Sequence, residues 1–196
     1  MELIHNGKAE TIQPTRCATV GDVVAACVAT DDRVLLGLRL DGCEIEPNEL
    51  TEVARLSTQG AGRLEVESRP RRDVACDALE SAAEYARRVV EALGKTATLL
   101  RDGELERAGA LCRDCLDALA VLTAAVRDSG AALGGVAAPL ASLEPELATP
   151  LAAMEGCFAT SDWVGLADCI EYEVAARVAL WPDRIGAVRA AAGGTA

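Results

Sequence analysis

Short apolar runs separated by turn residues fill the first part of the chain, up to about residue 70. Residues 1–5 predict a strand, and residues 8–13 predict the strand that returns beside it. Asn6-Gly7 stands between them, and these residue types tolerate the positive φ angles of a type I′ hairpin turn. The strongest strand signal is at 34–40, where apolar residues recur at a period of two. We expect one face to be shared by Val34, Leu36, Leu38 and Leu40.

A helix is predicted between the hairpin and the long strand. Thr19 followed three residues later by Asp22 is typical of a capping box, in which each side chain accepts a hydrogen bond from the other residue's backbone. The apolar residues expected on the buried face of this helix are Val20, Val23, Val24, Cys27 and Val28. Residues 43–46 and 63–68 predict two further strands, with a short helix near Leu50 between them. The predicted order is therefore strand, strand, helix, strand, strand, short helix, strand.

After Arg72 the apolar residues recur in steps of three and four, which is the stripe of a packed α-helix. Asp73 can cap the first helix, Asp102-Gly103 ends it, and a second helix begins near Glu104. The first stripe is Leu79, Ala82, Ala86, Val89, Leu93 and Leu100. The second stripe is Leu105, Ala108, Cys112, Cys115, Leu119, Leu122 and Val126. Because the connection is short, the two helices are expected to lie antiparallel as a helical hairpin.

A second helical hairpin is predicted beyond a crossing loop over residues 129–145, which glycines and prolines interrupt. Ser161-Asp162 supplies its turn and helix cap, and its last helix runs to Trp181, before Pro182. The stripe before the turn is Leu147, Leu151, Met154 and Phe158. The stripe after it is Trp163, Leu166, Ala167, Ile170, Val174 and Val178. Two stacked hairpins predict a four-helix bundle large enough to bury its own core.

The amino-acid composition changes at the same place in the chain as the spacing of the apolar residues. All five aromatic residues lie after Arg72, and they are Tyr85, Phe158, Trp163, Tyr172 and Trp181. The two changes together predict a domain boundary at residues 69–72. The sequence therefore predicts an α+β chain, with a small sheet domain over 1–69 and an all-α four-helix domain made of two helical hairpins over 73–190. Residues 191–196 are predicted to be a flexible tail.

The element order of residues 1–69, starting with the Asn6-Gly7 hairpin, resembles the ubiquitin-like β-grasp fold. Another small α+β domain with a mixed sheet is the alternative. Ubiquitin-like modifiers and sulfur carriers act through a Gly-Gly terminus directly after the last strand. In this chain that strand runs into Pro70 and a helical domain, and Gly193-Gly194 lies far downstream with Thr195-Ala196 after it. The helical part, with short acidic turns inside paired helices, resembles bacterial flagellar and type III export chaperones.

Charge and cysteine content narrow the class of protein. A net charge of −12 disfavours binding to nucleic acid and to anionic membranes, because phosphates repel such a surface. No apolar run approaches the ~18 residues of a membrane span, and no signal-peptide pattern opens the chain. Most of the eight cysteines sit inside apolar patterns. We therefore expect reduced, mostly buried thiols in a cytoplasmic protein.

Few residues carry candidate chemistry. The single histidine, His5, has no recognisable partner in the sequence and is expected to end an edge strand. Cys112 and Cys115 form a C-x-x-C, the spacing of thiol exchange motifs and of half a zinc site. Both cysteines fall on the second helix stripe, so core packing is favoured over a redox function. No phosphate loop, nucleophile elbow or dinucleotide fingerprint is present.

One cluster of carboxylates lies on the last predicted helix, where Asp168, Glu171 and Glu173 surround Tyr172. Paired carboxylates can perform acid–base catalysis or bind a cation, but a solvated helix face is the favoured interpretation. The sequence therefore predicts no catalytic residue, no metal site and no cofactor.

Four aromatic residues near the end of the helical part are the candidate partner-binding residues: Phe158, Trp163, Tyr172 and Trp181. Aromatic side chains dominate interface hot spots, although the two tryptophans could instead cap the ends of the bundle core. The predicted function is a non-enzymatic protein-interaction adaptor or chaperone-like assembly factor that binds protein partners, with a homo-oligomer as a further option. A ubiquitin-like or sulfur-carrier-type modifier precursor and a thiol redox protein are the alternatives.

Overall fold

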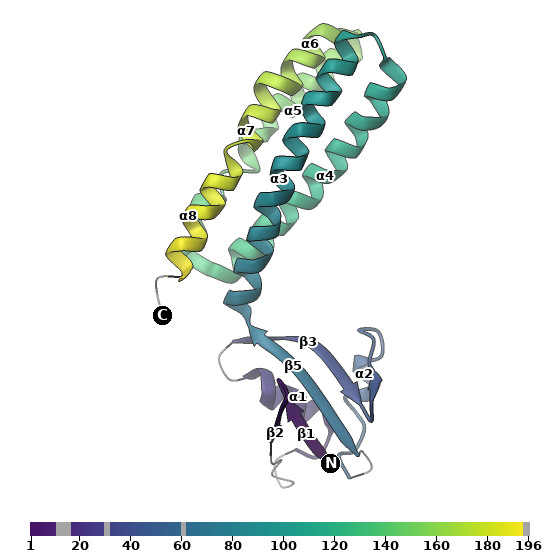
Figure 1. Cartoon of the computed structure of the whole chain (residues 1–196), viewed down its shortest axis with the longest axis vertical. Helices are drawn as coiled ribbons and strands as arrows, with labels where there is room; N and C mark the ends of the chain where they lie inside the picture. The colour runs from purple at the N-terminus through teal and green to yellow at the C-terminus, as the bar shows by residue number, and fades with distance from the viewer. Residues whose placement is uncertain (11–16, 30–31, 60–61, 194–196) are drawn as a thin grey trace. The chain divides into compact units, whose positions relative to one another are not determined.

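The computed structural model describes residues 1–10, 17–29, 32–59 and 62–193. The chain divides into two compact units, Met1–Val74 and Ala75–Ala196. The first unit holds a β-sheet and the second is helical (Figure 1). The predicted α+β class, with a sheet followed by helices, is confirmed.

The described strands of the first unit form a five-stranded mixed sheet in the order β2-β1-β5-β3-β4. Its strands are β1 (Glu2–His5), β2 (Lys8–Glu10), β3 (Arg33–Leu40), β4 (Cys43–Glu44) and β5 (Arg63–Pro70). β1 pairs in parallel with β5, and the other neighbours are antiparallel. With α1 (Val20–Ala29) and α2 (Leu50–Val53), the element order is the one that the sequence predicted. The predicted second strand extends to residue 13, and residues 11–13 lie outside the described ones.

Local signals fix two junctions of the sheet unit. Asn6 and Gly7 have φ angles of 50° and 77°, which confirms the predicted hairpin turn. The Asp22 carboxylate accepts a hydrogen bond from the Thr19 backbone N–H at 2.9 Å, and the Thr19 hydroxyl accepts one from the Asp22 N–H at 3.2 Å. The predicted capping box is therefore confirmed. These hydrogen bonds to Thr19 hold the pKa of Asp22 below its ordinary value, because they stabilise the ionised carboxylate.

The predicted face of β3 is wrong in part. Leu38 is buried in the sheet core, but Leu36 is 51% exposed. A β-bulge lies between Leu35 and Gly37, which pair with successive residues of β5. The extra residue reverses the alternation of the strand, so Leu35 turns toward the core in place of Leu36. The buried core residues of this unit are Leu3, Val20, Val23, Cys27, Leu38, Leu64 and Val66.

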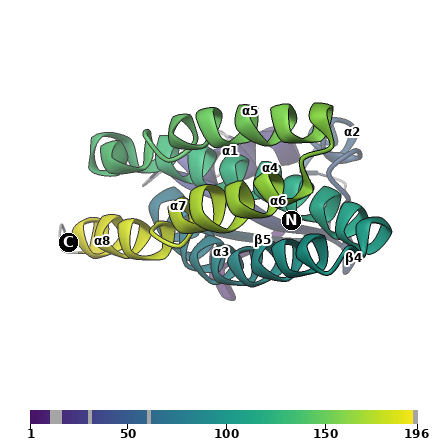
Figure 2. The same ribbon diagram turned by 90° about the horizontal axis from the view of Figure 1, so that it is seen from above.

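The helical unit is formed by long helices packed side by side (Figures 1 and 2). α6, the π-helix η2, α7 and α8 follow one another end to end and form a broken rod beside α3 and α5. The predicted four-helix count is not confirmed, because residues 71–193 hold six α-helices, α3 to α8. Their bounds, with those of the 3-10 helix η1 and of η2, are α3 (Arg71–Arg101), α4 (Leu105–Leu133), η1 (Gly134–Leu140), α5 (Pro145–Thr160), α6 (Trp163–Asp168), η2 (Cys169–Ala175), α7 (Ala176–Val178) and α8 (Trp181–Gly193).

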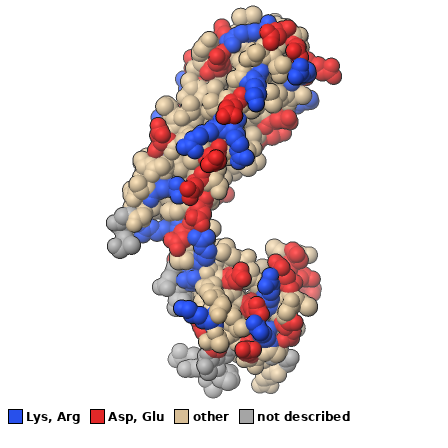
Figure 3. Space-filling model, in the orientation of Figure 1, with Lys and Arg blue, Asp and Glu red and all other residues tan. Residues whose placement is uncertain are grey.

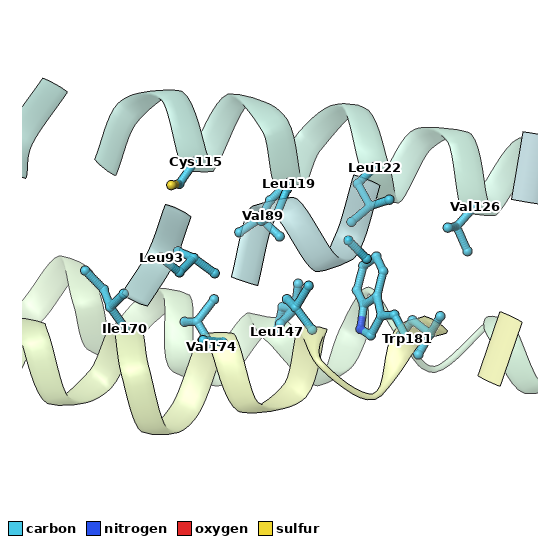
Figure 4. Close-up of a cluster of buried hydrophobic side chains, with 14 of the residues drawn as sticks. Val89, Leu93, Cys115, Leu119, Leu122, Val126, Leu147, Ile170, Val174 and Trp181 are labelled. Carbon is cyan, nitrogen blue, oxygen red and sulfur yellow. The ribbon is translucent and has the colours of Figure 1, made fainter. Parts of the chain in front are cut away.

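The core of the helical unit contains most of the predicted stripe residues. Figure 4 shows the side chains of α3 and α4 converging on those of α5, η2 and α8. All six predicted stripe residues of α3 are buried, and so are six of the seven on α4. The exception is Leu105, which is 41% exposed because it is the first residue of α4 and precedes the packed part of the stripe.

Three sequence-based boundaries in the helical part are wrong. The crossing loop predicted from Ser129 is helical at first, because α4 continues to Leu133 and η1 follows it. α3 begins at Arg71, directly after β5, so Asp73 lies in its first turn and is not its cap. The tail predicted over 191–196 is wrong for residues 191–193, which belong to α8. Ala192 is 1% exposed there, so this part of α8 is not a solvated tail.

The π-helix η2 has a packing explanation. Leu166, Ile170, Val174 and Val178 are all fully buried and are spaced four residues apart. In an α-helix of 3.6 residues per turn, each four-residue step rotates a side chain by about 40°, so this series would leave the core face. A π-helix has more residues per turn, and seven residues of η2 rotate the series back toward the core.

Candidate functional site

The four candidate aromatic residues do not form one surface. Phe158 and Trp163 meet edge to face across the α5–α6 turn, with ring centroids 5.7 Å apart. Phe158 is 46% exposed and Tyr172 is 63% exposed. Trp181 is fully buried, so it does not lie on an exposed surface with the other three. Trp181 lies in the core because it starts α8 on the side that faces α4 and α5 (Figure 4).

The α5–α6 turn is built by the residues that the sequence singled out. Ser161 adopts a left-handed conformation with φ of 56°, which ends α5. The Asp162 carboxylate accepts a hydrogen bond from the Gly165 N–H at 2.9 Å and caps α6. The predicted turn and cap are confirmed. Together they fix the start of α6, where Trp163 stands against Phe158.

The carboxylate cluster around Tyr172 is paired with an arginine from α3. Arg101 Nη2 donates to Asp168 Oδ1 at 2.8 Å, and its Nη1 donates to Glu171. The guanidinium also lies 5.9 Å from the centre of the Tyr172 ring. The hydrogen bonds that Arg101 donates to Asp168 and Glu171 raise its pKa, because they stabilise the charged guanidinium. Arg101 pairs with both carboxylates at once, so the arrangement favours a surface ion-pair network over an acid–base or cation site.

The C-x-x-C residues belong to the core. Cys112 is 4% exposed and Cys115 is 2% exposed. Burial raises the pKa of both thiols above the ordinary cysteine value. A thiolate is the species that attacks a disulfide, and this environment opposes its formation. The geometry therefore supports core packing for this pair.

His5 has hydrogen-bond partners that the sequence did not reveal, and its strand β1 lies between β2 and β5. Arg33 Nε donates to Ser68 Oγ at 2.9 Å, and Ser68 Oγ lies 2.8 Å from His5 Nε2. His5 Nδ1 in turn lies 3.2 Å from Glu10 Oε1. A serine, a histidine and a carboxylate in contact resemble the arrangement that activates a nucleophilic serine. Ser68, however, is 2% exposed, and its hydroxyl oxygen already accepts a hydrogen bond from Arg33. The network therefore satisfies a buried polar side chain, and it offers no access for a substrate.

A groove of about 670 Å³, large enough for a ligand, lies in the helical unit. It lies between α4, η1 and the start of α5, and Trp181 contributes to its lining. The groove exists because α5 has 16 residues and α4 has 29, so η1 covers part of the length of α4 in place of a helix. Its lining residues are Thr123, Val126, Arg127, Gly130, Ala131, Gly134, Ala137, Ala138, Leu140, Ala141, Leu143, Glu144, Pro145, Ala148 and Trp181.

Small apolar side chains form most of this groove. Thr123, Arg127 and Glu144 are the polar side chains in its described lining besides the Trp181 indole. Arg127 Nη1 lies 3.7 Å from Glu144 Oε2, so the two charges are close enough to offset each other. The Nε1 atom of Trp181 is buried and has no hydrogen-bond partner among the described residues. The pattern over residues 129–145 predicts a loop, so this groove is not predicted from the sequence, although these residues include a run rich in Gly and Ala.

The comparison with known families bears on the same unit. A family model described as a domain of unknown function, DUF8042, matches residues 77–184, which is more than half of the chain. The chain belongs to the DUF8042 family. The DUF8042 region contains the groove, the Phe158–Trp163 pair and the Arg101 cluster, and it excludes the sheet unit. No curated protein and no solved structure matches the chain.

Two further properties concern the described residues alone. None of their helices combines the length and the hydropathy that crossing a bilayer requires. None of their His, Cys, Asp and Glu side chains gather in threes or more in a way that could hold a metal ion. On the face shown in Figure 3, acidic and basic side chains stand among uncharged ones. Residues 75–196 carry 18 Asp and Glu against 10 Lys and Arg, so the helical unit is the more acidic part of the chain.

Proposed function

We propose that this protein is a non-enzymatic adaptor, or a chaperone-like assembly factor, whose helical unit binds an amphipathic helix of a protein partner. The groove between α4, η1 and α5 carries this proposal. A helix with one apolar face is the protein segment that such a groove accommodates, because the groove offers apolar walls and few polar partners. The occupant would supply the hydrophobic contacts that a longer α5 would otherwise make.

The dimensions of the helices support a helical occupant. α5 is about 24 Å long and α4 is about 43 Å long at 1.5 Å per residue. Over the difference in length, η1 contacts α4 and α8, and small side chains line the opening beside it. Side-chain size sets the distance between packed helices, so Ala131, Ala138 and Ala148 allow an incoming helix to approach closely.

The sheet unit fits the same proposal as a ubiquitin-like β-grasp module. Its β2-β1-β5-β3-β4 order, the parallel β1–β5 pair and the α1 helix against the sheet support this assignment. A β-grasp module would give the adaptor a surface that is chemically distinct from the groove, since function resides in surface sites grafted on a fold.

Site-specific photo-crosslinking tests the groove. A benzophenone amino acid replaces Ala131, an exposed residue of the groove wall, in the full chain expressed in its native host. The matched control places it at Val121, which is 64% exposed on the same helix and does not line the groove. We expect protein adducts from the first position and none from the second. Adding Ala138→Trp, which fills the groove from η1, should remove the adducts.

Three outcomes would refute the proposal. One is equal labelling from the two positions, which would indicate random collision and not docking. Another is labelling at Ala131 that survives the Ala138→Trp substitution while circular dichroism shows an unchanged helix content. Absence of any protein adduct at the groove position would likewise refute it.

A further inference from the structure

We infer that the end of the helical unit formed by the α3–α4 and α5–α6 turns is a second docking surface, and that its occupant is a basic amphipathic protein segment. The turn-end patch is defined here as Phe158, Trp163 and Val164. The inference rests on the proposed adaptor function but not on the groove. Phe158 is 13 residues from Pro145 at the groove, or about 20 Å along α5, so the two surfaces can be tested separately.

The patch exposes large apolar side chains to solvent. Phe158 is 46% exposed and Val164 is 65% exposed. Trp163 is half-buried, and its ring holds the Phe158 ring edge to face at 5.7 Å. This contact, together with the capped start of α6, keeps the aromatic pair in place before a partner arrives. A pre-ordered aromatic pair is typical of the anchor of a protein interface.

Acidic residues outnumber basic ones in the two turns at this end of the helical unit. Both turns lie at the same end of the helical unit (Figures 1 and 2), so the side chains of the α3–α4 turn belong to its surroundings. Residues 101–107 and 155–168 carry six carboxylates against two arginines. The carboxylates are Asp102, Glu104, Glu106, Glu155, Asp162 and Asp168.

The arginines are already engaged by part of this set. Arg101 pairs with Asp168, and Arg107 pairs with Glu104. Asp102, Glu106 and Glu155 form no ion pair with any residue in the part of the chain that the structure describes, and all three are exposed. Exposed carboxylates without a cationic partner around an apolar centre select an occupant with Lys or Arg beside large apolar residues. A guanidinium from such a segment can also stack on the Phe158 ring.

This charge distribution decides among the macromolecules that an aromatic patch could bind. Nucleic acid and anionic lipid would bring phosphates against the carboxylates, and these contacts are repulsive. A basic protein segment brings the opposite charge. The complementary charges would speed association and make it sensitive to salt, and the aromatic pair would supply the apolar contact.

Two matched peptides and an isotope-labelled full chain test the inference. One peptide places leucines and lysines at helical spacing, and the other keeps the leucines and replaces every lysine by glutamate. The indole N–H signals of Trp163 and Trp181 report separately on the patch and on the groove lining in one ¹H–¹⁵N spectrum. We expect the lysine peptide to shift the Trp163 signal and those of residues 158–165, and the glutamate peptide to leave them unchanged.

Variants test both components of the surface. Phe158→Ser with Val164→Ser should weaken the lysine peptide at least about tenfold, because it removes the apolar anchor. Asp102→Asn with Glu106→Gln should weaken it severalfold and reduce its salt dependence, because screening acts on exposed charges. Val121→Ser, which removes an equally exposed apolar side chain from the middle of α4, is the control and should change nothing.

The outcomes separate this inference from the adaptor proposal. Equal binding of both peptides, or binding unchanged by Phe158→Ser with Val164→Ser, would refute the basic-segment surface. Shifts confined to Trp181 and the groove would refute it too, while leaving groove docking in place. If no crosslinks form at the groove but the lysine peptide still binds the turn-end patch, docking in the groove is refuted and the inference about the patch stands.

Discussion

Trp181 offers the sharpest test of how the helical core is held together. It is the largest fully buried side chain in the described chain, and its Nε1 has no hydrogen-bond partner among the described residues. Truncation of a buried Trp to Ala removes its contacts and leaves a cavity, at a cost of about 3–5 kcal/mol. Trp181→Phe keeps one aromatic ring and removes an N–H whose burial without a partner costs about 1–3 kcal/mol. We therefore expect Trp181→Phe to lower the free energy of unfolding by less than about 1.5 kcal/mol, because the two effects partly cancel.

Urea unfolding of the full chain at neutral pH, followed by tryptophan fluorescence, measures both costs. Both tryptophans belong to the helical unit, and residues 1–74 contain no aromatic residue. Trp163 therefore reports on the helical unit alone in every Trp181 variant. For an m-value of about 2 kcal/mol/M, Trp181→Ala should lower the urea midpoint by about 2 M and Trp181→Phe by less than about 0.8 M.

A matched control and a clear contrary result accompany this test. Val121→Ala truncates a 64% exposed side chain of α4 and should change stability by less than about 0.5 kcal/mol. If Trp181→Phe were as unstable as Trp181→Ala, the buried indole N–H would not be destabilising the folded chain, and this prediction would be contradicted. A midpoint that Trp181→Ala leaves unchanged would show that Trp181 does not hold the core.

Three further predictions concern both units. Asp22→Ala should destabilise the start of α1, because it removes the carboxylate that accepts the Thr19 backbone N–H in the capping box. The pKa of Asp22 is lowered in the folded chain, so the stability difference between variant and wild-type chain should be fully present above the ordinary aspartate pKa. It should disappear as the pH falls through the lowered pKa. Hydrogen exchange of the α1 amides at a series of acidic pH values measures this difference. Leu38→Ala should cost about 2–5 kcal/mol and Leu36→Ala less than about 0.5 kcal/mol in thermal unfolding followed by far-ultraviolet circular dichroism, and equal losses would contradict the β-bulge assignment. In native protein a thiol-specific disulfide reagent should label the exposed Cys43 quickly and the buried Cys112 only on unfolding, and fast native labelling of Cys112 would reopen a redox function.

Features set by local chemistry could be read from the sequence. Asn6-Gly7 specifies a hairpin because few other pairs tolerate positive φ at both positions, and the structure has that turn. Thr19 and Asp22 specify a helix start through hydrogen bonds that span three residues. The stripes of α3 and α4 were predicted correctly because a long repeat in steps of three and four admits one amphipathic structure.

Features set by contacts between distant segments could not be read in this way. The bulge that turns Leu36 outward depends on the register between β3 and β5, which are about 30 residues apart in the chain. The exposure of Phe158 and the burial of Trp181 could not be told apart from their spacing, since both occur on apolar stripes. The groove was missed because a Gly- and Ala-rich run is typical of a loop, and it becomes a groove wall where α4 continues and η1 packs against it.

The amino-acid sequence alone determined the order of the elements, their caps and turns, the change from sheet to helices near residue 70, and the acidic charge. These follow from backbone preferences and periodicities that act over a few residues. The tertiary structure decided which aromatic side chains reach solvent, that Arg101 pairs with both Asp168 and Glu171, and that a short α5 leaves a groove beside α4. These three features depend on where separate helices end relative to one another. Which side chains are buried and which charges pair is settled only when the helices have packed.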